Sequence, residues 1–173
     1  MFGPELHAEN ATGAVRLAPI NYDDLPETVD PQVTEYLTDY FRDFVMALPE
    51  QYEWLERGAD NLHWGIYDKA ANNLLGITGV RNLGADKGPA VSRIALFANG
   101  LRSRGIGSLA YCAQYEYLKR SDISDLYEHV AANGNIGSLR IAARVGFVAI
   151  HNDGQRTTMH LHINAAKEKP GEE

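Results

Sequence analysis

The segment Arg102-Ser103-Arg104-Gly105-Ile106-Gly107 joins an apolar run that ends near Phe97 to a helix-like pattern that starts near Gly105. A glycine-rich turn between a strand and a helix exposes backbone N–H groups at the helix N-terminus. The partial positive charge of the helix dipole adds there to the charge of the two arginines. The segment therefore predicts a phosphate-binding loop, whereas a glycine pair standing alone would indicate only a tight turn and close packing.

Two common nucleotide-binding motifs nearly match this loop. Gly100 and Gly105 have the spacing of a P-loop, but Ile106-Gly107 stands where that motif needs Lys followed by Ser or Thr. The run from Gly105 to Ala110 also fits G-x-G-x-x-A, the dinucleotide fingerprint. That motif expects an acidic residue at the end of the next strand, whereas Asp125 opens it. The nucleotide-hydrolase hypothesis fails, and the dinucleotide hypothesis is disfavoured.

On both sides of the loop, the spacing of apolar residues predicts one α/β (α+β) domain. Apolar residues alternate in the strand candidates and recur at three- and four-residue steps in the helix candidates. The predicted strands span residues 15–20, 62–67, 74–80, 90–97, 126–131, 147–150 and 157–163. The predicted helices span residues 31–48, 50–57, 105–117 and 138–145. These elements predict a mixed, mostly antiparallel sheet of about seven strands with about four helices.

Length and composition narrow the class of protein. The 173 residues fit one domain, with an ordered core expected at about 13–164 and a polar tail at 165–173. We expect a cytoplasmic protein without a membrane span, because no apolar run approaches ~20 residues and the start lacks a signal-peptide pattern. The lone Cys112 excludes an internal disulfide and an all-cysteine metal site. The net charge of −7 argues against nucleic acid as partner and favours a cationic one.

Two motifs at the right distance from each other resemble one family. Arg102-x-x-Gly105-x-Gly107 resembles the Gln/Arg-x-x-Gly-x-Gly/Ala signature of the GCN5-related N-acetyltransferase (GNAT) family. Asn135, Ser138 and the later Gly146-Phe147 resemble that family's Asn-x-x-Ser/Ala and terminal Gly-Phe. The order of predicted elements also resembles this fold from about residue 15 to 163. Within the family, the pattern is most similar to the branch of ribosomal-protein N-terminal acetyltransferases.

The resemblance implies a site for acetyl-CoA as cosubstrate, without a metal. It implies that loop amides hold the pyrophosphate, and that the pantetheine arm lies between two central parallel strands that splay apart. The implied cofactor contacts are Phe97, Ala98, Arg102, Ser103, Arg104, Gly105, Ile106, Gly107, Asn135 and Ser138. From local sequence alone, Asn135 fits an Asx turn or helix cap equally well, and Ser138 fits a first-turn helix residue.

Direct acetyl transfer needs a neutral amine, a donor for the oxyanion and a proton for the departing thiolate. A backbone N–H near Phe97 is one candidate for the oxyanion. Glu128 and His129 are candidates for the base, and only one of them can face the cleft because strand side chains alternate. Many relatives carry a tyrosine acid where this chain has Ala142, so Tyr127, Tyr111 or a water would have to supply the proton.

Other chemistry-bearing residues receive simpler interpretations. His160 and His162 share one strand face, but without a third ligand at a convincing spacing we expect solvent exposure instead of a metal site. Cys112 is expected to pack in the helix after the loop. The aromatic residues of the first two helices are expected to form core or to line the acceptor site. They are Tyr36, Tyr40, Phe41, Phe44, Tyr52 and Trp54.

Together, these patterns predict an N-acetyltransferase that moves acetyl from acetyl-CoA to a primary amine, either a peptide N-terminus or a small amine. Two alternatives stay open. One is a non-catalytic acyl-CoA-binding module, suggested by Ala142, and the other is a dinucleotide-binding oxidoreductase. A homodimer is a further expectation, with no membrane partner.

Overall fold

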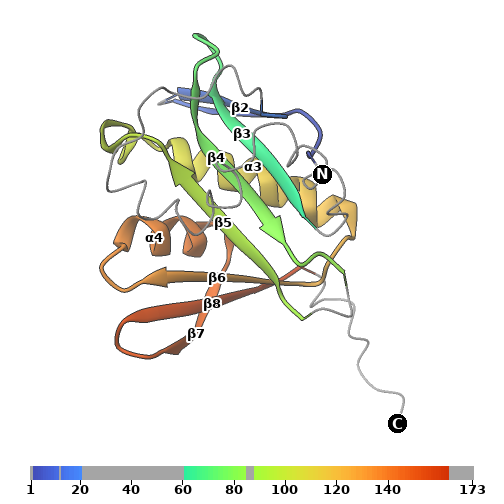
Figure 1. The fold of residues 1–173 in the computed structure, drawn as a ribbon, viewed down its shortest axis with the longest axis vertical. Coiled ribbons are helices and arrows are strands. Elements are labelled where there is room, and N and C mark those ends of the chain that lie inside the picture. Colours follow the sequence, from blue (N-terminus) through green and yellow to red (C-terminus); the bar gives the residue numbers. More distant parts are fainter. Residues whose placement is uncertain (1, 12, 21–60, 85–87, 164–173) are drawn as a thin grey trace, which may run out of the picture.

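The fold is built on one sheet, and the computed structural model describes residues 2–11, 13–20, 61–84 and 88–163. Eight strands lie in the order β1-β2-β3-β4-β5-β6-β8-β7 (Figure 1). The strands are β1 (Leu6–Asn10), β2 (Gly13–Ala18), β3 (Leu62–Asp68), β4 (Leu74–Arg81), β5 (Ala90–Leu96), β6 (Leu126–Ala132), β7 (Val148–Asn152) and β8 (Arg156–His162). The helices are the 3-10 turn η3 (Asn99–Leu101), α3 (Ile106–Ser121) and α4 (Ile136–Val145).

All neighbouring strands in this order pair antiparallel, except β5 and β6, which are parallel. The predicted mixed, mostly antiparallel sheet is therefore confirmed, and each predicted strand is present. The additional strand is β1, whose sequence LHAEN contains one large apolar residue and gives no strand pattern. Backbone pairing from Leu6↔Leu17 to Asn10↔Gly13 forms it, so the sheet begins before residue 13.

Some predictions concern residues outside the described part of the chain. The helices predicted at 31–48 and 50–57 lie there, together with Tyr36, Tyr40, Phe41, Phe44, Tyr52 and Trp54. Among the residues that the structure does describe, no helix is long and apolar enough to cross a membrane.

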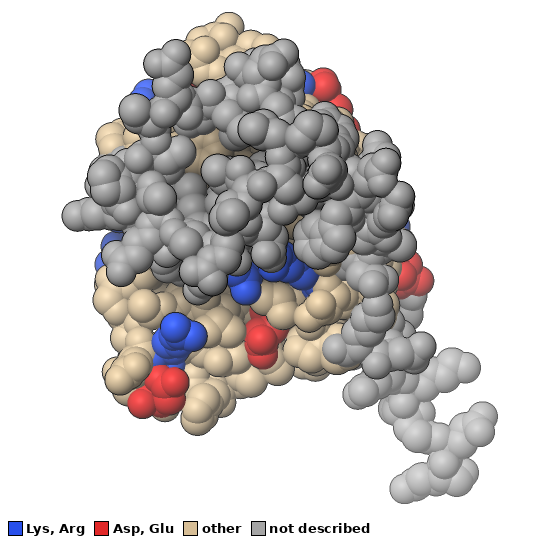
Figure 2. All heavy atoms as spheres, viewed as in Figure 1, with Lys and Arg blue, Asp and Glu red and all other residues tan. Residues whose placement is uncertain are grey.

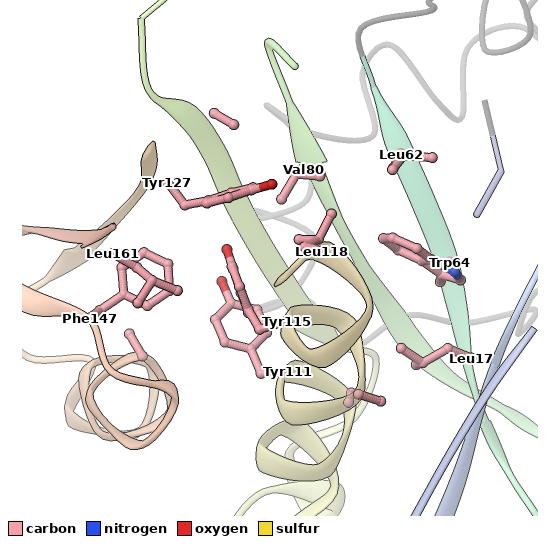
Figure 3. Packing of buried hydrophobic residues seen from close by; sticks show 14 of the residues in the cluster. Leu17, Leu62, Trp64, Val80, Tyr111, Tyr115, Leu118, Tyr127, Phe147 and Leu161 are labelled. Atoms are coloured by element: carbon pink, nitrogen blue, oxygen red, sulfur yellow. The ribbon is translucent and has the colours of Figure 1, made fainter. Parts of the chain in front are cut away.

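Helix α3 covers one face of the sheet and carries the centre of the core (Figure 1). Its buried Tyr111, Tyr115 and Leu118 lie between the side chains of β2, β3 and β4 on one side and those of β6, β8 and Phe147 on the other (Figure 3). The ring of Tyr115 meets the rings of Tyr111, Tyr127 and Phe147 edge to face, with centroids 5.4, 5.4 and 5.2 Å away. Aromatic contacts of this geometry add to the burial energy and fix the position of the helix.

The parallel pair β5 and β6 is the feature of the sheet that positions the site. Only its first two positions are paired, Ala90 with Tyr127 and Val91 with Glu128. Beyond them the two strands diverge, although β5 continues to Leu96 and β6 to Ala132. The fork formed in this way opens toward the C-terminal end of β5, where the glycine loop leads into α3. The splayed parallel pair implied by the family resemblance is thus present.

Candidate functional site

The glycine loop ends in an open helix N-terminus. Ser103 has a φ of 62° and Gly105 has a φ of 80°, both in the left-handed region that glycine adopts at little cost. Gly105 is the N-cap of α3, and no side chain caps the helix. The N–H of Leu109 donates to the Gly105 carbonyl at 3.0 Å, so intrahelical bonding starts there. The N–H groups of the first turn have no intrahelical acceptor, and they can therefore bind an anion.

Gly107 serves packing as well as the loop. A Cβ atom at this position would lie 2.9 Å from Cδ1 of Ile141 in α4 and 3.6 Å from Cδ1 of Ile94 in β5. Gly107 therefore allows α3 to approach α4 and the sheet closely. The sequence allowed a tight turn or close packing for the glycine pair. The structure shows the turn at Gly105 and the close contact at Gly107.

The exposed part of the loop carries its positive charge. Arg102, Ser103 and Arg104 are all exposed, and they precede the first turn of α3 directly. The dipole of α3 also favours negative charge at this position. The structure therefore brings the predicted loop residues together next to the uncapped N-terminus of α3.

The backbone of β5 offers hydrogen-bonding groups toward the fork. The N–H of Phe97 donates to the carbonyl of Leu75 in β4 at 2.9 Å, so the backbone of Phe97 faces β4. In an antiparallel pair, such residues alternate with residues whose backbone groups face the other neighbour. Leu96 and Ile94 are those residues here, and their N–H and C=O groups face the side of β6. The carbonyl of Ala98 accepts from the N–H of Leu101 at 3.1 Å.

This alternation changes which groups can contact a bound arm. The family resemblance implies backbone contacts at Phe97 and Ala98, and the oxyanion donor was expected near Phe97. Because the Phe97 N–H is used within the sheet, the donors that face the fork come from Ile94 and Leu96. The sequence carries no signal for this, since it does not show which residues of a central strand face which neighbour.

Asn135 forms the N-cap of α4, where its Oδ1 accepts from the N–H of Ser138 at 3.2 Å. This is the helix-cap interpretation that the sequence allowed. The cap occupies only the carbonyl oxygen of the side chain, so it is compatible with Nδ2 donating to a ligand. The cap also fixes the direction of the side chain just after the end of β6.

His129 lies on the helix side of β6 and joins three elements. Its Nδ1 lies 2.9 Å from the hydroxyl of Tyr111 in α3, and its Nε2 lies 2.8 Å from Oγ of Ser138 in α4. Only 3% of the residue is exposed, and burial lowers the pKa of the imidazole to about 4. A neutral imidazole has one donor and one acceptor nitrogen, and the two hydroxyls match both. The Ser138 hydroxyl is thus engaged within the protein.

Glu128 points to the opposite face of the sheet. Its Oε2 lies 3.3 Å from Nε2 of His160, the residue directly across on β8. The two side chains are 25% and 20% exposed, respectively. The expectation that His160 is solvent exposed is therefore wrong, because a cross-strand carboxylate partly covers it, whereas His162 is exposed. In the part of this face that Figure 2 leaves uncovered by grey atoms, basic and acidic side chains lie near one another.

The remaining candidates lie within the core or beside it. Burial, with a smaller effect of Asp125, raises the pKa of the Tyr127 hydroxyl to about 12. Cys112 is half-buried, and burial raises the pKa of its thiol. Ala142 is fully buried in α4, and its carbonyl accepts the N–H of Phe147 at 3.1 Å. Within the described residues, no group of three His, Cys, Asp or Glu side chains could hold a metal ion.

Comparison with known proteins agrees with this geometry. A model of the Acetyltransferase (GNAT) domain matches residues 14–148. This match spans most of the chain, which therefore belongs to the GNAT acetyltransferase family, a family of acyltransferases that use acetyl-CoA. The family prediction is confirmed, and the oxidoreductase alternative is set aside. No curated protein sequence matches the chain at a significant level.

Solved structures show the same fold at low sequence identity. A GNAT-family acetyltransferase from Bacillus anthracis superposes with a TM-score of 0.66 at 14% identity, covering 93% of this chain and 99% of the other. Spermidine N-acetyltransferase from Vibrio cholerae, in complex with CoA and spermine, gives 0.64 at 14%, covering 87% and 96%. RimL, a ribosomal L7/L12 α-N-protein acetyltransferase in complex with coenzyme A, gives 0.62 at 13%, covering 87% and 95%.

Proposed function

We propose that this acetyltransferase moves acetyl from acetyl-CoA directly to a primary amine, either a peptide N-terminus or a small amine, in a ternary complex. One observation carries the proposal. The parallel strands β5 and β6 part after two paired positions, next to the uncapped N-terminus of α3. Coenzyme A has a pyrophosphate and, beyond it, an arm that contains amides. The uncapped helix N-terminus fits the pyrophosphate, and the adjoining fork between the strands fits the arm.

In this proposal the loop holds the pyrophosphate. The N–H groups of residues 105–108 bind its oxygens at the end of the α3 dipole, and Arg102 and Arg104 add positive charge. The pantetheine arm then runs into the fork, where the backbone groups of Ile94 and Leu96 pair with its amides. The Nδ2 atom of Asn135 donates to the arm from the β6 side, while Oδ1 keeps the helix cap.

The chemistry of the proposed reaction is direct attack. The neutral amine attacks the thioester carbonyl, and a fork-facing N–H of β5 stabilises the oxyanion. A side chain on the acceptor side takes the proton that the amine loses, and the thiolate leaves. His129 does not fit the role of base, because both of its ring nitrogens face hydroxyl groups in the core. Tyr127, with a pKa of about 12, is a poor proton donor to a thiolate.

The acceptor in this proposal carries a positive charge in its protonated form. Two of the three structural relatives named above act on a polyamine and on a protein N-terminus, and both acceptors present an amine. The net charge of −7 attracts either kind by long-range electrostatics. Thiol release from acetyl-CoA, measured with a serine-initiated peptide and with spermidine, tests the function and separates the two acceptor classes.

A second candidate function rests on Ala142, which stands buried where many relatives carry a tyrosine acid. In that case the chain would bind acyl-CoA without turning it over. Protection against thermal unfolding by acetyl-CoA, without thiol release with any amine of the panel, would favour this second function.

The cofactor loop has its own test. Gly105→Val forces a β-branched residue into a φ of 80° and displaces the amides that bind the pyrophosphate. We expect a loss of coenzyme A affinity of about 10-fold or more, measured by calorimetry. Gly100→Ala is the matched control, because a Cβ at Gly100 meets no atom within 4 Å. Equal affinity in the Gly105→Val variant and the control would reject the loop assignment.

A further inference from the structure

We infer that Glu128 and His160 form the acid–base pair of the proposed reaction. His160 takes the proton that the acceptor amine loses, and Glu128 holds the imidazole in position. The inference rests on the proposed function, which it extends by naming two side chains on the face of the sheet opposite α3.

The pair stands where the fork closes. Val91↔Glu128 is the last paired position of β5 and β6, so the Glu128 side chain projects at the point where the strands part. The loop that binds the pyrophosphate lies at the open end of the fork. An arm that enters from the loop therefore runs toward this closed end, and its reactive terminus comes to lie near Glu128. His160 is the direct cross-strand neighbour of Glu128 on β8.

Burial and contacts suit these side chains for proton transfer. At 25% and 20% exposure, the carboxylate and the imidazole are partly shielded from water but can still be reached by a substrate. The contact of 3.3 Å between Oε2 of Glu128 and Nε2 of His160 directs the Nε2–H of a neutral ring to the carboxylate. Nδ1 is then the atom that accepts a proton, as in other arrangements where a carboxylate orients a histidine.

The surrounding charges also lie on this face. Strand β8 adds His162, whose ring centroid is 6.5 Å from that of His160. It also adds Arg156, which shares this face because it lies four residues before His160 in the strand. Strand β5 adds the exposed Arg93, and β4 adds Arg81 at the edge of its pairing with Val91. In β7, Val148 lies directly across from His160. On β8, His160 is thus the residue that meets the Glu128 carboxylate, one strand away from the fork.

The step balances with the groups named. The lone pair of the amine forms a C–N bond to the thioester carbon, and the C–S bond breaks with its electron pair staying on sulfur. The proton lost by the amine passes to Nδ1 of His160, and the positive charge of the imidazolium is stabilised by the Glu128 carboxylate. The thiolate then takes this proton and leaves as free coenzyme A, which returns the pair to its starting state.

The test uses the full chain with acetyl-CoA and two acceptors, a serine-initiated peptide and spermidine, with thiol release as readout. In His160→Gln we expect kcat/KM to fall by about 100-fold or more, because general base catalysis contributes at least that factor. His160→Ala should lose as much and recover part of its activity when free imidazole is added. Glu128→Gln should lower kcat by about 10-fold, with an unchanged KM for acetyl-CoA. His162→Ala is the matched control and should stay within about 2-fold.

Rescue by imidazole and unchanged affinity for coenzyme A separate a chemical role from a structural one. Activity within about 3-fold of wild type in His160→Gln would overturn the inference. Loss of activity in His160→Ala without any recovery in imidazole, together with weaker coenzyme A binding, would also overturn it. If the wild-type chain binds acetyl-CoA but releases no thiol with either acceptor, the proposed function itself fails, and that result is distinct from both others.

Discussion

The two faces of β6 differ in how completely they engage their polar side chains. On the helix side, His129 is 3% exposed and both ring nitrogens meet hydroxyls, within 2.9 and 2.8 Å. On the other side, the adjacent Glu128 meets one ring nitrogen of His160 and stays 25% exposed. Two neighbouring residues of the same strand therefore differ in both burial and the number of polar contacts. A fully engaged and buried group holds the fold together, whereas a partly exposed pair keeps an atom available for chemistry.

The largest effect should come from breaking the helix-side contacts. His129→Ala leaves a cavity and removes the partner of two hydroxyls, those of Tyr111 and Ser138. We expect a loss of about 2–4 kcal/mol in the free energy of unfolding, measured by urea titration. Glu128→Ala on the opposite face should cost less than about 1 kcal/mol, since the pair with His160 is partly exposed. Similar losses in the two variants would contradict the difference between the faces.

Acid should weaken the helix side through His129. Burial lowers the folded-state pKa of His129 from 6.5 to about 4. The unfolded chain therefore binds more protons between these values, and stability is lost as the pH falls from about 6.5 to about 4. The contribution is on the order of 3 kcal/mol.

His63 acts in the same direction, because burial, followed by the charge of Arg81, lowers its pKa to about 3. The quantity to compare is therefore the change in the free energy of unfolding with pH, in a His129 variant and in wild type. Urea unfolding at pH 6.5 and 4.5 should show a smaller pH dependence in His129→Gln than in wild type. Parallel slopes in the two proteins would show that His129 is not the buried neutral group described above.

A smaller effect should separate packing from cofactor binding at Gly107. Gly107→Val places a Cβ 2.9 Å from Cδ1 of Ile141, and overpacking of this kind costs about 1–3 kcal/mol. Adding Ile141→Val, which removes the Cδ1 atom, should recover part of this stability. Coenzyme A affinity is then compared in the single and double variants. If Gly107→Val lowers the affinity and Ile141→Val restores it together with the stability, Gly107 acts through packing alone. An affinity that stays low in the double variant would show that Gly107 also faces the cofactor.

The smallest effect should come from the cap at the end of β6. Asn135→Ala removes the bond to the Ser138 N–H and should cost about 1 kcal/mol of stability. Asn135→Ser keeps an acceptor for the cap but has no amide nitrogen. We expect the serine variant to regain the stability and not the affinity for coenzyme A, measured by thermal unfolding and calorimetry. Full recovery of both would leave Asn135 with a structural role only.

Much of the fold could be predicted from the sequence, because its signals are local. Alternating apolar residues and the change of period after Gly105 place the strands and helices, and each predicted strand in the described residues is present. Strand β1 was not predicted, since LHAEN offers only Leu6 and Ala8 as an apolar face and forms through pairing with β2. The family resemblance implied the parallel pair, but its short register depends on contacts between distant segments.

The candidate site was predicted less completely, for a physical reason. Motif spacing identifies the loop and Asn135, since those residues act through local backbone geometry. Which of Glu128 and His129 faces the core depends on the register of β6 against β8 and on where α3 lies. The contact between Glu128 and His160 joins residues far apart in the chain. The sequence showed only that His160 and His162 share a face.

A structure of the chain with acetyl-CoA bound would show which face of β6 the thioester meets. We expect the pyrophosphate on the N–H groups of residues 105–108, and the arm between β5 and β6. The thioester should lie at the closed end of the fork, on the face of Glu128 and His160. A thioester on the side of His129, or a cofactor bound away from the loop, would contradict this account.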